Sequence, residues 1–237
     1  MKIKNSVVLV TGANRGLGLA FAKALVARGA RKVYAGARDP GSLETISGVT
    51  PISLDVNDPA SLARVAALCN DVNLLVNNAG IATLLQGPLD PALINVSRAM
   101  LETNYFGVVR TTQALVPMIV ANGGAVLNVL SDHTWIAHPV LAAYAPSKSA
   151  AWSFTNALRT ELRDKHVQVL GLHVGYLDTD MTRGLDLKKS DPRAVVELAL
   201  DALEAGEEEV LADDGTRAIK RSLSSAVPFY LVPMQAA

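Results

Sequence analysis

The sequence is poor in cysteine, since its 237 residues include only Cys69. A single thiol excludes a disulfide within the chain and fits a reducing cytosol, so we expect Cys69 to be a small apolar residue on a helix. An excess of charge of one sign is also lacking, because Lys plus Arg and Asp plus Glu both total 22. A chain without net charge has no overall field to attract nucleic acid or an anionic membrane surface.

Long apolar runs are absent as well. No stretch reaches the roughly 18 consecutive apolar residues that indicate a membrane-spanning helix. The apolar run at residues 7–10 follows two lysines, but it is too short for a secretory signal and is ended by Gly12 and Arg15. No cluster of His, Cys and acidic residues has metal-ligand spacing. These absences predict a cytoplasmic protein with no metal, membrane or nucleic-acid partner.

The chain does contain an alternation of strand-like and helix-like segments. Short apolar runs occur at 6–10, 32–37, 50–56, 72–78, 125–131 and 167–175, with a weaker one at 207–213 after a helical segment at 192–205. Near-continuous apolar strands separated by helices indicate a parallel sheet covered on both faces. We predict an α/β fold, a Rossmann-type doubly wound parallel β-sheet of about seven strands. It forms a single domain over 1–237, and 216–237 is a candidate for a C-terminal helix and tail.

The first predicted strand runs directly into a glycine-rich turn, TGANRGLG at 11–18. Gly12, Gly16 and Gly18 permit a tight turn and close approach of the backbone to a phosphate. The helix that follows presents unpaired N–H groups and the positive end of its dipole, where a pyrophosphate can lie. The spacing G-x-x-x-G-x-G differs from the common dinucleotide fingerprint, so a purely structural turn is the alternative.

A second pattern lies at 131–148, where Ser131, Tyr144 and Lys148 supply a hydroxyl, a phenol and an amine. Tyr144 and Lys148 are spaced i, i+4, so they share one face of a helix. Taken alone, this pattern is either an ordinary helix start with a solvated lysine or a set of residues for proton transfer.

Together with NNAG at 77–80 and Asn104, these patterns resemble the classical short-chain dehydrogenases/reductases over most of the chain. The resemblance implies an enzyme that transfers hydride between a nicotinamide cofactor and a carbonyl or secondary alcohol, as in ketone or aldehyde reduction. It implies that Tyr144 is the acid and base, with Lys148 lowering its pKa from about 10 and binding the nicotinamide ribose. Ser131 is implied to donate a hydrogen bond to the substrate oxygen, and Asn104 to support a water linked to Lys148.

The resemblance also implies a set of cofactor-binding residues. NNAG would border the adenine ribose, and the alternative is a plain strand-end turn. Asp55 resembles the acid that meets the adenine amino group, and the alternative is an exposed carboxylate without this role. Thr179 falls where the family places a hydroxyl against the nicotinamide carboxamide. The full set is Gly12, Asn14, Arg15, Gly16, Leu17, Gly18, Arg38, Asp55, Val56, Asn78, Ala79, Gly80, Tyr144, Lys148, Gly175 and Thr179.

The end of the second strand indicates which nicotinamide cofactor is bound. An NAD site usually offers a carboxylate there to the ribose 2′-hydroxyl, but this sequence has Ala37 followed by Arg38. Arg38 suits a 2′-phosphate, and Arg15 is a second arginine that NADP-preferring members often carry. Asp39 argues the other way, although DPG is typical of a turn. We therefore expect NADP (NADPH), with NAD as the less favoured cofactor.

Some features depart from the family pattern or do not fix the function. Val174 stands where the family has proline before Gly175, and the short connector at 183–192 predicts a small lid. The helices at 91–121 and 142–164 commonly form the family's dimer interface, so we expect a homodimer or homotetramer. The alternative function is an NADP-binding regulatory member with a degraded site and no turnover. Candidates for lining the substrate pocket are Asp132, His133, Trp135, Ile136, His138 and Val140.

Overall fold

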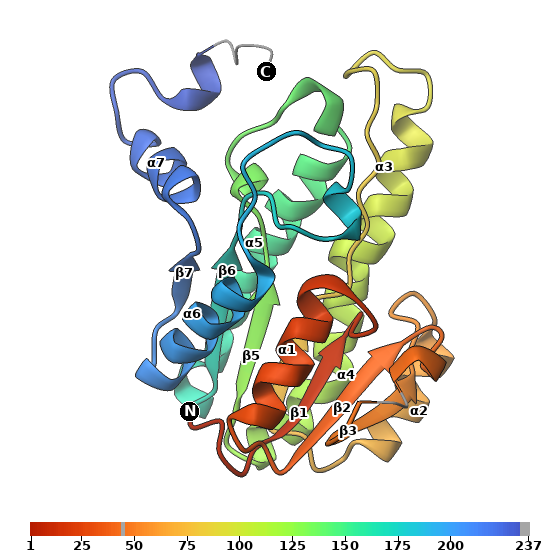
Figure 1. Ribbon diagram of the computed structural model, residues 1–237. Helices are drawn as coiled ribbons and strands as arrows, with labels where there is room; N and C mark the ends of the chain where they lie inside the picture. The colour runs from red at the N-terminus through yellow and green to blue at the C-terminus, as the bar shows by residue number, and fades with distance from the viewer. Residues whose placement is uncertain (44–45, 233–237) are drawn as a thin grey trace.

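The computed structural model describes residues 1–43 and 46–232, which fold around one parallel sheet (Figure 1). The order across the sheet is β3-β2-β1-β4-β5-β6-β7, and neighbouring strands run parallel. The predicted Rossmann-type fold is therefore confirmed. The described residues form the strands β1 (Val7–Thr11), β2 (Lys32–Ala37), β3 (Val49–Ser53), β4 (Leu74–Asn77), β5 (Ala125–Val129), β6 (Gln168–His173) and β7 (Glu209–Leu211).

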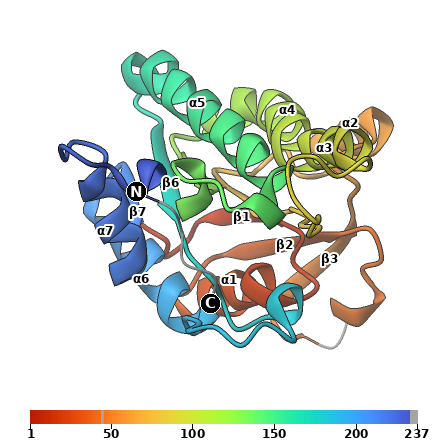
Figure 2. The ribbon, with the colours of Figure 1, turned by 90° about the horizontal axis from the view of Figure 1, so that it is seen from above.

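Helices cover both faces of this sheet, as the view from above shows (Figure 2). One face packs against α1 (Gly16–Ala27) and α6 (Pro192–Ala205). The other packs against α2 (Pro59–Leu68), α4 (Gly107–Ala121) and α5 (Tyr144–Leu162). The helix α3 (Leu93–Leu101) continues through a π-helical turn at Glu102–Phe106 into α4.

The central strands are buried on both faces, which explains their near-continuous apolar sequence. All five residues of β1 are buried. Two of the buried polar residues in these strands are Asn77 and Asn128, which are partners in the β4–β5 register. Asn77 Nδ2 donates to Asn128 Oδ1 (2.9 Å) and to Thr112 Oγ1 (3.0 Å), and Asn128 Nδ2 donates to Thr155 Oγ1 (2.9 Å). These hydrogen bonds offset the loss of hydration and tie the sheet to α4 and α5.

The C-terminal part follows the predicted order of a strand and then a helix. The helix α7 (Asp214–Ser222) begins two residues before the expected position, because Asp213 caps it through Oδ1 and the Thr216 N–H (2.8 Å). Cys69 is buried at the end of α2, where burial raises the pKa of its thiol to about 12, so it is an unreactive apolar residue as expected. None of the described helices has both the length and the apolar character needed to cross a membrane.

The strand order reverses between β1 and β4, because β2 lies on one side of β1 and β5 on the far side of β4. In an open α/β sheet, the connections from such neighbours leave in opposite directions, and a crevice opens at the carboxyl ends of the strands. The fold therefore places the glycine-rich turn after β1, NNAG after β4 and Ser131 after β5 around one crevice.

Candidate active site

The glycine-rich turn leaves room for backbone alone. Gly12 has a φ of +64°, and a Cβ there would lie 2.9 Å from the Cα of Ala79. A Cβ on Gly18 would lie 2.3 Å from the carbonyl oxygen of Gly12. The first turn of α1 is not capped by the side chain of Arg15, its N-cap residue. A close-packed turn before an uncapped helix N-terminus fits the pyrophosphate of a dinucleotide.

Hydrogen bonds between the ends of β1 and β4 fix this turn. Thr11 Oγ1 accepts from the N–H groups of Asn78 and Ala79, both at 3.0 Å. Asn78 Nδ2 donates to the carbonyls of Thr11 (2.9 Å) and Gly12 (3.1 Å). NNAG thus has a structural role in the crevice, and Thr11 is a residue that the sequence motifs did not single out.

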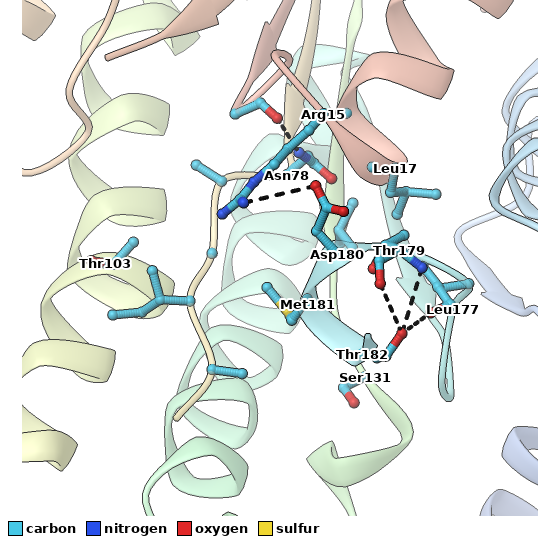
Figure 3. Close-up of a pocket in the computed structure, with 18 of the residues that line it drawn as sticks. Arg15, Leu17, Asn78, Thr103, Ser131, Leu177, Thr179, Asp180, Met181 and Thr182 are labelled. Carbon is cyan, nitrogen blue, oxygen red and sulfur yellow. Dashed lines mark hydrogen bonds and ion pairs between the residues drawn. The ribbon is translucent and has the colours of Figure 1, made fainter. Parts of the chain in front are cut away.

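The crevice is a cavity of about 620 Å³ that joins the two sequence patterns (Figure 3). It reaches from the glycine-rich turn to the start of α5, and residues at the ends of six strands, β1 to β6, contribute to its walls. Asn104 is the one member of the expected site that does not line it. The expected residues that do are Gly12, Asn14, Arg15, Gly16, Leu17, Gly18, Arg38, Asp55, Val56, Asn78, Ala79, Gly80, Ser131, Tyr144, Lys148, Gly175 and Thr179.

The rim near β2 carries the side chains expected to select the cofactor. Ala37 is the last residue of β2, and Arg38 and Asp39 follow it exposed on the cavity rim. Asp39 Oδ1 accepts from the Gly41 N–H (3.1 Å), so this carboxylate closes a turn, as its sequence indicates. Arg15 extends over the cavity from the glycine-rich turn and lies 3.9 Å from Asp180 (Figure 3).

Tyr144 is the first residue of α5 and Lys148 lies one turn later, and both line the cavity wall. Lys148 is 6% exposed, and its Nζ donates to the carbonyl of Val129 (3.0 Å). The same Nζ lies 5.8 Å from the centre of the Tyr144 ring. Burial lowers the pKa of Lys148 to about 8, because the apolar surroundings disfavour its charged form.

The expected lowering of the Tyr144 pKa is wrong for this structure. Burial raises the pKa of Tyr144 above its ordinary value, and the nearby Ser131 side chain acts in the opposite direction. The negative charge of Asp132 contributes further to the rise. Desolvation outweighs the effect of Ser131, although Tyr144 is only partly buried on the cavity wall, so Tyr144 holds its proton through neutral pH.

Ser131 follows β5 and caps the short helical turn at Asp132–Thr134. Its Oγ accepts from the His133 N–H (3.2 Å) and donates to Asp132 Oδ1 (3.0 Å). Among the pocket candidates from 132–143, His133 lines the cavity, while Asp132, Trp135, Ile136, His138 and Val140 do not. Leu141, which was not a candidate, lines it as well.

Asn104 lies in the π-helical turn, outside the cavity lining, and is 1% exposed. Its amide pairs with the backbone of Ile81 in both directions, accepting from N–H (2.8 Å) and donating to the carbonyl (2.9 Å). It also donates to Ser147 Oγ (3.0 Å), in the helix that carries Tyr144 and Lys148. Asn104 therefore joins the segment after β4 to α5, and a π-turn at such a position is frequent at functional sites.

The segment after β6 forms one side of the cavity without the family's proline. The Val174 carbonyl accepts from the Asp132 N–H (3.0 Å), and the Gly175 N–H donates to Asp213 Oδ2 (2.9 Å). These bonds fix the path that proline would otherwise restrict. A bridge between Leu177 and Ser190 connects the two ends of the segment expected to form a lid.

Beneath Ser131 lies His173, another residue without a sequence signal for the site. His173 is fully buried, its Nδ1 hydrogen-bonds the carbonyl of Ser131 (3.0 Å), and its ring stacks on Trp135 at 4.1 Å. Burial lowers its pKa to about 4, so the ring is neutral and Nδ1–H is the donor to the carbonyl. This contact supports the backbone from which the Ser131 side chain projects.

Comparison with known proteins agrees with this arrangement. The family model of short chain dehydrogenases matches residues 6–190. The dehydrogenase/reductase SDR family member 7B of Rattus norvegicus is 32% identical, covering 86% of this chain and 71% of its own. A short chain dehydrogenase from Burkholderia cenocepacia, solved with NADP, is 38% identical with a TM-score of 0.89, covering 95% of each chain. The 3-ketoacyl-(acyl-carrier-protein) reductase of Brucella melitensis, solved with NADH, is 25% identical with a TM-score of 0.77, covering 84% of this chain and 91% of its own.

The matched region contains the turn after β1, NNAG and the Ser131, Tyr144 and Lys148 set, which line one crevice, and Asn104, which hydrogen-bonds to the helix of Tyr144 and Lys148. The chain belongs to the short chain dehydrogenase family.

Proposed function

We propose that this protein is an NADP(H)-dependent oxidoreductase that reduces a ketone or aldehyde, or oxidises the corresponding alcohol, with Tyr144 as the acid and base. The observation that carries the proposal is the shared cavity. One crevice is lined by the phosphate-binding turn at one end and by Ser131, Tyr144 and Lys148 at the other. A dinucleotide and a carbonyl group can therefore meet within it.

The protonation of Tyr144 supports reduction as the favoured direction. A bound nicotinamide supplies or accepts the hydride. The residue that acts on the substrate oxygen must then provide a proton as that oxygen becomes an alkoxide. Because burial raises the pKa of Tyr144, its phenol keeps this proton at neutral pH. Alcohol oxidation needs the phenolate instead. Burial disfavours this charged form, because it removes the phenolate from water.

Lys148 and Ser131 assist Tyr144 in different ways. When protonated, the Lys148 ammonium stabilises a phenolate after proton transfer, and its position beside Gly80 suits a ribose hydroxyl. Ser131 provides a hydroxyl beside the phenol, where it can orient the substrate oxygen. Asn104 is proposed to act behind them, through its hydrogen bonds to Ile81 and Ser147.

The preference for NADP over NAD rests on charge at the β2 end of the cavity. Arg15 and Arg38 both line that end, and no carboxylate stands at Ala37, the last residue of the strand. Two guanidinium groups can bind a 2′-phosphate through charge-assisted hydrogen bonds. The NADP bound by the Burkholderia cenocepacia relative supports this choice, whereas the NADH bound by the Brucella melitensis reductase supports the alternative.

The test is a panel of ketones and aldehydes assayed with NADPH and with NADH, following the loss of reduced cofactor. We expect turnover of at least one carbonyl compound, with a higher kcat/KM for NADPH. Tight NADPH binding without turnover of any compound would contradict the proposal and favour the regulatory, degraded-site function.

We also propose that the protein is a cytoplasmic homodimer or homotetramer that uses the α3–α4 and α5 helices as an interface. Ile94 on α3 is 61% exposed and Phe106 in the π-turn is 44% exposed, so this surface offers apolar contacts to a second copy. Light scattering of the purified protein tests this, and a monomer at all concentrations would contradict it.

A further inference from the structure

Asp132, the residue after Ser131, is buried beside the catalytic hydroxyl. It is 8% exposed, and its Oδ1 accepts two hydrogen bonds, from Ser131 Oγ (3.0 Å) and from the His133 N–H (2.8 Å). Nothing in the sequence motifs assigns this carboxylate a role.

The hydrogen bonds of Ser131 can be counted. A serine hydroxyl has one hydrogen to donate and two lone pairs to accept with. An ionised carboxylate only accepts, so the hydrogen of Ser131 must point to Asp132. The His133 N–H donates to one of the lone pairs at 3.2 Å. In this arrangement Ser131 has no hydrogen left to donate to a substrate oxygen.

We propose that Asp132 is a positioning residue that holds the Ser131 hydroxyl hydrogen away from the substrate while its carboxylate is ionised, and releases it when the carboxylate is protonated. This inference rests on the proposed function, because it concerns the hydrogen bond that Ser131 gives to the reacting oxygen. It adds a second protonation step to a site in which Tyr144 alone exchanges a proton with the substrate.

The surroundings of Asp132 allow such a protonation step. The titratable groups that face it are His133, Tyr144, Tyr176 on the segment after β6, and Asp213 before α7. Asp132 and Asp213 flank the same glycine, Gly175, and their like charges oppose each other.

Burial, together with Asp213, raises the pKa of Asp132 above its ordinary 3.8. A protonated His133 would act in the opposite direction, but burial lowers the pKa of that ring as well, so it is neutral near pH 7.

The direction of the pH effect follows from these protonation states. Above the pKa of Asp132 the carboxylate takes the Ser131 hydrogen, which is then not available to the substrate oxygen. Below that pKa the neutral carboxyl is a weaker acceptor, and the Ser131 hydrogen is free to turn to the substrate oxygen. Carbonyl reduction should therefore become slower as the pH rises through the pKa of Asp132.

The first test needs no substrate. The carboxyl pKa of Asp132 is measured by NMR on protein labelled at its aspartate carboxyl groups, with Asp132→Asn identifying the resonance. In Ser131→Ala, the ionised carboxylate of Asp132 loses one of its hydrogen-bond donors. The pKa of Asp132 should therefore rise by about one pH unit or more. An unchanged pKa would overturn the proposal, because the hydroxyl would then not be bound to this carboxylate.

The second test measures hydride transfer from NADPH at a pH well above the pKa of Asp132, on the best compound of the carbonyl panel. Asp132→Asn should increase the rate about tenfold, the factor that corresponds to a hydrogen bond of ordinary strength. In a Ser131→Ala background the same substitution should have no effect, since Asp132 acts through Ser131. NADPH affinity and melting temperature serve as controls for a structural effect.

An unchanged or lower rate in Asp132→Asn, or an equal increase in the Ser131→Ala background, would overturn the proposal while leaving the proposed function intact. If the wild-type protein reduces no compound, the proposed function fails instead, and the NMR measurement decides whether Asp132 holds the Ser131 hydrogen.

Discussion

Replacing Lys148 by Met should make the protein more stable at neutral pH. It should also remove the contribution of this lysine to the pH dependence of the unfolding free energy. Lys148 is buried, and its pKa falls from 10.5 in a free chain to about 8 in the fold. Between these values the unfolded chain binds a proton that the folded protein releases, so wild-type stability rises with pH across this window. Below about pH 8 the folded protein carries the full penalty of a buried ammonium.

The size of the effect follows from the shift. A difference of about 2.5 pH units corresponds to roughly 3 kcal/mol of unfolding free energy at about 1.4 kcal/mol per unit. Met removes this penalty but also loses the hydrogen bond from Nζ to the Val129 carbonyl, worth about 1 kcal/mol. Lys148→Met should therefore be about 2 kcal/mol more stable than wild type at neutral pH and about 1 kcal/mol less stable above pH 10.5.

The assay is urea unfolding of both proteins at neutral and alkaline pH, comparing the difference in unfolding free energy at each pH. Taking this difference removes the contribution of other titrating groups that the two proteins share. Lys23→Met, at an exposed position on α1, controls for the change of side chain. If the difference between wild type and Lys148→Met is constant from pH 7 to the alkaline end, Lys148 does not carry a buried charge and the reasoning is refuted.

Other predictions concern the residues around this lysine. Lys148→Met should also weaken NADPH binding, measured by calorimetry, and move the pH optimum of alcohol oxidation upward; a fixed optimum would confine Lys148 to cofactor binding. Asn104→Leu removes three hydrogen bonds and should lower the unfolding free energy by about 3 kcal/mol in urea, whereas an unchanged midpoint would mean that its contacts contribute nothing. We expect the wild-type kcat/KM to be about 30-fold higher with NADPH than with NADH, equivalent to about 2 kcal/mol, and Ala37→Asp with Arg38→Ile should reverse this preference. A retained preference would place the selecting residues elsewhere. Gly18→Ala should abolish NADPH binding, since its Cβ would lie 2.3 Å from a backbone oxygen, and normal affinity would contradict the close-packed turn.

Much of this fold could be predicted because its signals are local. The apolar runs that became β1, β2 and β4–β6 are buried on both faces, and each lies close to its predicted bounds. The glycine-rich turn, NNAG and the spacing of Tyr144 and Lys148 are short patterns whose geometry follows from strand ends and one helical turn. Parallel topology then brings these ends to the same edge of the sheet.

The remaining features depend on contacts between residues far apart in the chain. The rise in the Tyr144 pKa was missed because helical spacing shows the nearby lysine and not the extent of burial. The bond between Asn77 and Asn128 appears only when β4 and β5 pair in register. The contact of His173 with the Ser131 carbonyl needs the packing of β6 against the segment after β5. No pattern within a short window carries this information.

The most direct test of the central claim is single-turnover carbonyl reduction by Tyr144→Phe, with NADPH binding measured on the same sample. The substitution removes one hydroxyl and keeps the ring, so the fold and the cofactor affinity should be retained. Without its proton donor, the reduction rate should fall by on the order of 10² or more. A variant that binds NADPH normally and reduces the carbonyl at the wild-type rate would contradict the assignment of Tyr144 as the acid and base.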